Sequence, residues 1–88
     1  MTRPFTVEMP PRVAASVRRL PTDVKKSVRE AIRALAHDPD LGLFLVRELE
    51  GLSRYRVRRY RIVYEVDRRR RRLRVMAVGH RREVYETL

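Results

Sequence analysis

The residues best suited to binding or catalysis lie between Tyr55 and Tyr85, beginning with an arginine-rich run that ends at Val66. Apolar and aromatic side chains alternate in this run with arginines, including Arg56 and Arg61. An arginine side chain carries a planar fork of hydrogen-bond donors that stays charged at neutral pH and matches the oxygens of a phosphate. The run therefore indicates a surface that binds a phosphate-rich ligand.

A second group of such residues follows in the segment Gly79–Tyr85. Gly79 permits a bend of the backbone, His80 can exchange a proton near neutral pH, and Arg81 can hold a phosphate. Tyr85 can stack on a base or share a hydrogen bond. In the structural alternative, His80 and Arg81 cap the end of a strand and Tyr85 packs under a short helix. The arginine-rich run nearby favours the functional interpretation.

The sequence lacks the motifs of several other kinds of site. It has no cysteine, and its two histidines, His37 and His80, lie 43 positions apart without a carboxylate cluster of known metal-binding spacing. It has neither a glycine-rich phosphate loop nor a nucleophile elbow. We therefore expect no metal and no cofactor. An enzyme with this sequence would work through positioned cations and an imidazole or a tyrosine.

Charge is unevenly distributed along the chain. The formal net charge is +11, and 20 of the 22 basic residues are arginines. Residues 1–50 hold nine basic and seven acidic side chains, whereas residues 51–88 hold thirteen and four. Because such crowding costs stability through self-repulsion, we expect a polyanionic partner, with nucleic acid first and an anionic membrane surface or an acidic protein next. The five consecutive arginines Arg68–Arg72 predict a mobile hairpin tip that raises nonspecific affinity for nucleic acid.

Length and hydrophobic pattern define the fold class. The 88 residues form one small domain, and no apolar run resembles a signal peptide or reaches the length of a membrane span, so we expect a cytoplasmic protein. Apolar spacing predicts a strand at Phe5–Met9 and a helix at Arg12–Leu20. It also predicts a second helix that is capped by Thr22 and stops at His37.

The second half of the chain predicts mainly strands. Residues 38–44 indicate a loop with apolar anchors, namely Leu41, Leu43 and Phe44. The order β-α-α-β-β-β-α predicts an α+β domain, in which two N-terminal helices cover one face of a mainly antiparallel sheet and the other face is left for function. The three expected strands of this half are Tyr55–Val57, Tyr60–Val66 and Leu73–Val78, and Glu83–Leu88 is expected to form a short C-terminal helix. Leu45–Leu49 could add a further strand before them.

The turn between two of these strands has an unusual composition. Arg58 and Arg59 occupy it, whereas a two-residue hairpin turn prefers residues that tolerate positive φ. We therefore expect this turn to be strained or wider than usual.

Four stretches of the chain carry a family resemblance: Leu49-Glu50-Gly51-Leu52, Tyr55-Arg56-Val57, Tyr60-Arg61-Ile62-Val63-Tyr64-Glu65-Val66 and Val78-Gly79-His80-Arg81-Arg82-Glu83-Val84-Tyr85. With the elements before them, they closely resemble the RelE branch of the RelE/ParE toxin superfamily over nearly the whole chain. The resemblance implies a RelE-like fold and a small microbial endoribonuclease that cuts messenger RNA in the ribosomal A site and so halts translation. In that site the protein would also contact 16S rRNA. It also implies an acidic RelB-like antitoxin as partner, and operator DNA only through the antitoxin complex.

The same resemblance implies roles for individual residues. Arg61 matches the arginine that faces the scissile phosphate, and Arg81 matches a second phosphate-stabilising arginine. Tyr85 matches a tyrosine that orients or stacks on the substrate, and His80 falls where relatives carry lysine or histidine as base or acid. The implied reaction is a metal-independent attack of the RNA 2′-hydroxyl on the adjacent phosphorus. The positions implied to contact RNA are Arg56, Arg58 and Arg82.

Two other functions fit the sequence. The ParE branch shares the fold but inhibits DNA gyrase and lacks nuclease activity, and the combination of Arg61, His80, Arg81 and Tyr85 argues against it. A noncatalytic module would use the positively charged half for affinity alone. It would bind RNA in a salt-dependent way and would cleave nothing.

Overall fold

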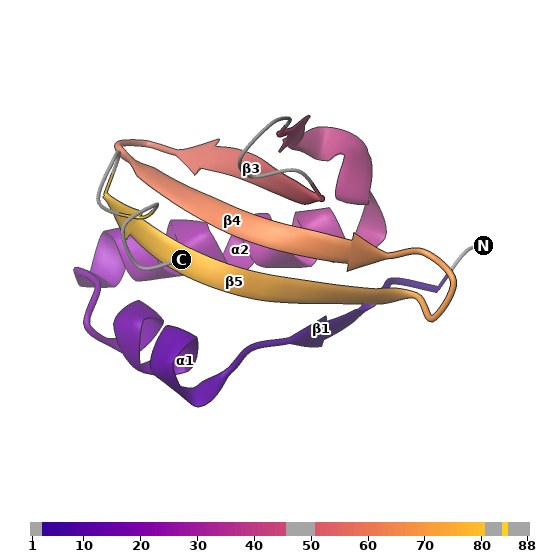
Figure 1. Cartoon of the computed structure of the whole chain (residues 1–88). Coiled ribbons are helices and arrows are strands. Elements are labelled where there is room, and N and C mark those ends of the chain that lie inside the picture. Colours follow the sequence, from indigo (N-terminus) through magenta and orange to yellow (C-terminus); the bar gives the residue numbers. More distant parts are fainter. Residues whose placement is uncertain (1–2, 46–50, 81–83, 85–88) are drawn as a thin grey trace.

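The computed structural model of the chain describes residues 3–45, 51–80 and 84, and contains two helices followed by a sheet (Figure 1). The expected α+β class is confirmed. The elements in chain order are β1 (Thr6–Glu8), α1 (Pro11–Arg18), α2 (Thr22–His37), the 3₁₀ helix η1 (Pro39–Leu41), β2 (Leu43–Phe44), β3 (Leu52–Val57), β4 (Tyr60–Asp67) and β5 (Arg72–His80).

The five strands form one mixed sheet with the order β1-β5-β4-β3-β2. β1 runs parallel to β5, and the other neighbouring pairs are antiparallel, so the sheet is mainly antiparallel as predicted. Both helices cover the same face (Figure 1). β5 is apolar at Val75 and Ala77–Val78 because it lies inside the sheet, between β1 and β4.

The main core lies between the helices and the sheet. Alternation along β4 sends Ile62 and Tyr64 into this core, where both are fully buried. The helices contribute apolar residues at helical spacing, including Val13 and Val17 of α1. The remaining large contributors are Val28, Ile32, Leu35, Leu73 and Val75.

A smaller apolar cluster lies on the other face of the sheet. It consists of Val63, Ala77 and Val84, with Leu52 and Met76 packed against it. The pairing of β4 with β5 shifts by one residue here, because Val63 pairs with Ala77 while the next residue, Tyr64, pairs with Val75. The extra residue between them is Met76, as in a β-bulge. Val84 therefore covers part of the face that we expected to be left open for function.

Two predictions near the helices are wrong. Thr22 makes no side-chain cap, because it is the first residue of α2 and Pro21 occupies the N-cap position. The Pro21 carbonyl accepts a hydrogen bond from the Lys25 N–H at 2.8 Å. The expected apolar anchors after α2 are exposed, and Pro39 is the buried residue of η1. The predicted strand Leu45–Leu49 falls almost wholly outside the described residues, as does the predicted helix Glu83–Leu88.

The arginine run between β4 and β5 makes defined contacts, although we expected a mobile tip. Arg68 donates a hydrogen bond to Asp40, and Arg71 donates one to the carbonyl of Arg3. The Arg71 guanidinium also lies over the Phe5 ring, 4.5 Å from its centroid. These contacts fasten the turn to the start of the chain and to η1.

Within the described ranges, 3–45, 51–80 and 84, no helix is long and apolar enough to cross a membrane.

Candidate nucleic-acid interface

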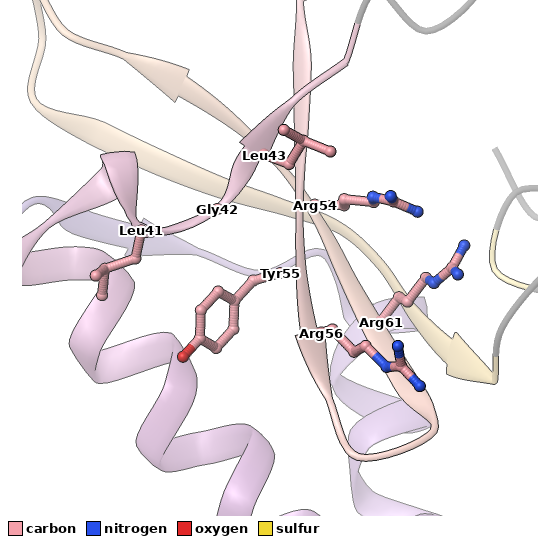
Figure 2. Close-up of a pocket in the computed structure, with 7 residues that line it drawn as sticks. All are labelled: Leu41, Gly42, Leu43, Arg54, Tyr55, Arg56 and Arg61. Atoms are coloured by element: carbon pink, nitrogen blue, oxygen red, sulfur yellow. The ribbon is translucent and has the colours of Figure 1, made fainter.

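The β3–β4 hairpin gathers three arginines on the sheet face opposite the helices. Arg56 pairs directly with Arg61, and Arg54 pairs with Val63 of the smaller apolar cluster. Residues directly opposite each other in an antiparallel pair project to the same face, and so do residues two apart on one strand. Figure 2 shows the three guanidinium groups on one side of the hairpin, while Tyr55 points to the other side.

These arginines line a concavity of about 340 Å³, which is at the small end of the range for ligand pockets. Arg54 and Arg61 are half-buried, whereas Arg56 is exposed. Among the described residues that line this pocket, the charged side chains are the three arginines. Its full lining is Leu41, Gly42, Leu43, Arg54, Tyr55, Arg56 and Arg61.

The turn after β3 orients Arg56. The Arg56 Nε donates a hydrogen bond to the Arg58 carbonyl at 3.0 Å. The turn has two residues, since Val57 pairs with Tyr60, and Arg58 adopts a φ of 56°. A residue with a Cβ is strained in this region, so the strain expected at this turn is present.

The Arg58 side chain does not line the arginine pocket. Its Nη1 lies 2.7 Å from Oδ2 of Asp23 at the start of α2. The hydrogen bond from Arg58 lowers the pKa of the Asp23 carboxyl, and the backbone N–H of Val24 acts in the same direction. In this structure Arg58 ties the turn to α2, and its role in RNA binding stays a prediction.

His80 lies on a different side of the sheet from Arg61. It pairs with Tyr60, and the two rings meet edge to face with centroids 5.3 Å apart. Tyr60 packs against the main core on the helix-covered face, whereas Arg61, the next residue, projects to the opposite face. The role of His80 as an acid or base stays a prediction.

Three predicted site residues, Arg81, Arg82 and Tyr85, lie outside the described residues. The nearest described residue after His80 is Val84, which is buried on the arginine side of the sheet. A Cβ built on Gly79 would lie 3.5 Å from the Val84 backbone, and Gly79 is the cross-strand partner of Arg61. Val84 therefore packs beside the strand position that faces Arg61.

Arg54 and Leu43 are two of the lining residues that were not predicted to belong to the site. Arg54 is two residues before Arg56, so the same alternation that identified Arg56 could have found it. Leu43 was predicted to be an apolar anchor of the loop at residues 38–44. Only its pairing with Arg54 in the structure shows that it lies beside the arginines.

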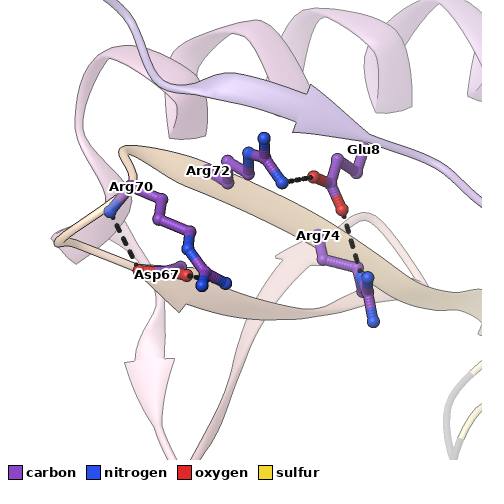
Figure 3. A network of polar contacts seen from close by, with 5 residues as sticks. All are labelled: Glu8, Asp67, Arg70, Arg72 and Arg74. Carbon is purple, nitrogen blue, oxygen red and sulfur yellow. Dashed lines mark hydrogen bonds and ion pairs between the residues drawn. The ribbon is translucent and has the colours of Figure 1, made fainter.

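The far end of the same face has a different charge pattern (Figure 3). Arg72 and Arg74 both contact Glu8, at 3.2 and 3.3 Å, and Arg70 lies 3.9 Å from Asp67. Carboxylates therefore offset the arginines at this end. In the described residues, no group of three or more histidine, cysteine, aspartate or glutamate side chains could hold a metal ion.

Comparison with known proteins gives one family and a consistent set of folds. Residues 7–85 match the family described as ParE toxin of type II toxin-antitoxin system, parDE. The toxin in the Mycobacterium tuberculosis RelBE2 toxin–antitoxin complex is similar, with 28% identity, a TM-score of 0.81 and coverage of 92% of this chain and 95% of that one. No curated protein sequence matches.

Two further structures show the same fold at lower identity. A mutant of Escherichia coli toxin RelE in the free state has 20% identity and a TM-score of 0.79, with coverage of 96% of this chain and 93% of that one. The archaeal RelE–RelB complex from Pyrococcus horikoshii has 19% identity and a TM-score of 0.72, with coverage of 89% and 96%.

Proposed function

We propose that this chain, which belongs to the RelE/ParE toxin superfamily of type II toxin–antitoxin systems, is a ribosome-dependent endoribonuclease that cleaves messenger RNA in the A site. The observation that carries this proposal is the gathering of Arg54, Arg56 and Arg61 in one pocket on a sheet. Side chains on paired strands are held more precisely than side chains on loops, so they can stabilise charge that develops at one phosphate.

The proposed reaction is an intramolecular transesterification. The 2′-oxygen of the RNA forms a bond to the adjacent phosphorus while the bond from phosphorus to the 5′-oxygen breaks. The 2′-hydroxyl loses a proton, and the leaving 5′-oxygen gains one. The products are a 2′,3′-cyclic phosphate and a 5′-hydroxyl end. The protein has to hold the attacking and leaving oxygens in line and neutralise the charge on the phosphate.

Arginine cannot readily give up a proton, so we assign electrostatic roles to Arg61 and Arg81. Arg61 would face the scissile phosphate, with Arg56 beside it as an RNA contact. Proton transfer falls to Tyr85 or to a ribosomal group. His80 is the less direct candidate, because its ring packs against Tyr60 on the other face. Arg58 and Arg82 stay proposed as contacts to RNA.

We further propose a RelB-like antitoxin as the partner that controls this activity. Two of the similar structures are complexes of a toxin with its antitoxin, RelBE2 and RelE–RelB. An acidic antitoxin would complement the +11 charge of this chain and would cover the same arginine face as RNA. Operator DNA would be bound only through that complex. An activity on ribosomes would place the protein in the cytoplasm.

The second candidate function is inhibition of DNA gyrase. The observation that favours it is the family match itself, because the matching description is that of a ParE toxin. A gyrase inhibitor would use the arginine face to bind a protein or DNA. The arginines of β3 and β4 would then not have to be positioned around a single phosphate.

One induction experiment separates these functions. The chain is expressed in a bacterial host without its antitoxin, and RNA 5′ ends and DNA integrity are followed, with the uninduced host as control. Sharp cuts within the codons of translated messages, with DNA intact, are the expected result. DNA damage with intact RNA would replace the proposal with gyrase inhibition. Growth arrest with neither cuts in RNA nor damage to DNA would leave a noncatalytic RNA-binding module.

A further inference from the structure

The large apolar side chains exposed to solvent in the described residues all belong to one short segment. Leu41, Leu43 and Phe44 have exposed fractions of 47%, 58% and 61%, and they span the end of η1 and the whole of β2. Exposed apolar side chains mark a binding surface where they adjoin other groups that a ligand can contact, so the surroundings of each of these side chains decide its role.

This segment is held firmly against the sheet. The buried Tyr64 hydroxyl donates a hydrogen bond to the Pro39 carbonyl at 2.7 Å. A Cβ at Gly42 would lie 2.1 Å from that hydroxyl oxygen and 2.6 Å from the Arg54 carbonyl oxygen. Only glycine allows so close an approach, so the backbone beside Leu43 is fixed relative to β3 and β4.

Leu43 and Phe44 face opposite sides of the sheet. Leu43 pairs with Arg54 and shares its face, and it lines the pocket that contains Arg56 and Arg61. Figure 2 shows the Leu43 side chain on the arginine side of β3. Phe44 pairs with the buried Ser53 and projects away from the pocket. The pocket thus has a cationic side and an exposed apolar wall.

We propose that Leu43 is a platform for a nucleobase next to the phosphate held by Arg54, Arg56 and Arg61. In RNA an anionic linkage and the apolar face of a base always lie within one nucleotide of each other, which matches a cationic group beside an apolar wall. A phosphate ligand without bases would need only the arginines. The inference rests on the proposed function for its choice of RNA as the ligand.

The test compares two polyanions. Binding of the whole chain to a short single-stranded RNA and to inorganic polyphosphate is measured at the same salt concentration, for wild type, Leu43→Ala and Phe44→Ala. Phe44→Ala is the matched control, because Phe44 is the adjacent and equally exposed apolar residue on the other face. Circular dichroism and thermal unfolding check that each variant is folded.

Leu43→Ala is expected to weaken RNA binding about fivefold to tenfold and to leave polyphosphate binding unchanged, since only the base loses its apolar contact. Phe44→Ala should bind both ligands like wild type, and Leu43→Trp should bind RNA more tightly because an aromatic ring stacks better on a base. Unchanged RNA binding by Leu43→Ala would overturn the proposal. An equal loss of affinity for RNA and for polyphosphate would also overturn the proposal, because Leu43 would then act only by positioning the arginines.

Three further outcomes separate this proposal from its alternatives. If Leu43→Ala binds RNA like wild type but loses affinity for the cognate antitoxin, the platform serves a protein partner and the proposal fails. Cleavage on ribosomes is measured separately. A wild-type chain that binds bases through Leu43 but cleaves nothing would refute the nuclease function and keep the base platform. A Leu43→Ala variant that binds RNA like wild type while the wild-type chain cleaves on ribosomes would refute the base platform and keep the nuclease function.

Discussion

Asp23 and Arg58 join the first turn of α2 to the β3–β4 turn through a contact of 2.7 Å between Oδ2 and Nη1. The Arg58 carbonyl in turn accepts the hydrogen bond from the Arg56 Nε. A helix on the covered face of the sheet is thus connected, through one residue, to an arginine of the pocket on the other face. This connection explains why an arginine occupies a turn position that normally favours glycine.

The Asp23 contact should contribute stability that depends on pH. Arg58 lowers the pKa of Asp23 below its ordinary value of 3.8 in the folded protein. The contribution is therefore present above that value and is lost as the pH falls through the folded pKa. We expect Asp23→Asn to melt at a lower temperature than wild type near neutral pH, and the difference to be small because the pair is exposed. This difference in melting temperature should disappear in acid. A difference in melting temperature that persists at the lowest pH where both proteins fold would show that the charge of Asp23 does not cause the stabilisation.

The strain at Arg58 predicts an ordering of variants. Arg58→Gly and Arg58→Ala both lose the contact with Asp23, but only glycine accepts a φ of 56° without a Cβ penalty. Arg58→Gly should therefore be more stable than Arg58→Ala by about 1 kcal/mol, after allowing for the greater freedom of glycine in the unfolded chain. Urea denaturation of the two variants measures the difference. Arg59→Gly against Arg59→Ala is the control, and there alanine should be at least as stable.

The strands were easier to predict from the sequence than the positions of the residues around the arginine pocket. Period-two alternation separated the arginines from the apolar side chains of their strands, because a strand with one buried face allows only one register. Whether Arg56 and Arg61 share a face depends on the turn between their strands, and the sequence left that open. His80 was harder to place, since the bulge at Met76 reverses which residues of β5 face the helices from that point on. The exposure of Leu43 was not predictable either, because apolar residues in a loop usually anchor it.

The arginine run shows a similar limit. Five like charges in a row indicate a solvated tip when only sequence neighbours are considered. Their contacts with Asp40 and with the Arg3 carbonyl join residues 28 and 68 positions apart, and no local pattern reports such contacts.

The placement of His80 predicts a small effect on catalysis. Its ring contacts Tyr60 on the helix-covered face, so it does not reach a phosphate bound at Arg61 without turning. We expect His80→Gln to cleave messenger RNA on purified ribosomes at close to the wild-type rate. A loss as large as that caused by removal of a pocket arginine would place His80 in proton transfer after all, by way of a side-chain rotation on RNA binding.

The most direct measurement is the single-turnover rate of messenger RNA cleavage on purified ribosomes by wild type, Arg61→Ala and Arg74→Ala at saturating protein. Arg74 is the matched control, because it is an exposed arginine of the same sheet that pairs with Glu8 at the opposite end. If Arg61 stabilises the phosphate in the transition state, Arg61→Ala should lose about 10²–10³ in rate while staying folded. Arg74→Ala should cleave at nearly the wild-type rate. Equal rates for wild type and Arg61→Ala would contradict the account, because the pocket arginines would then have no part in the reaction.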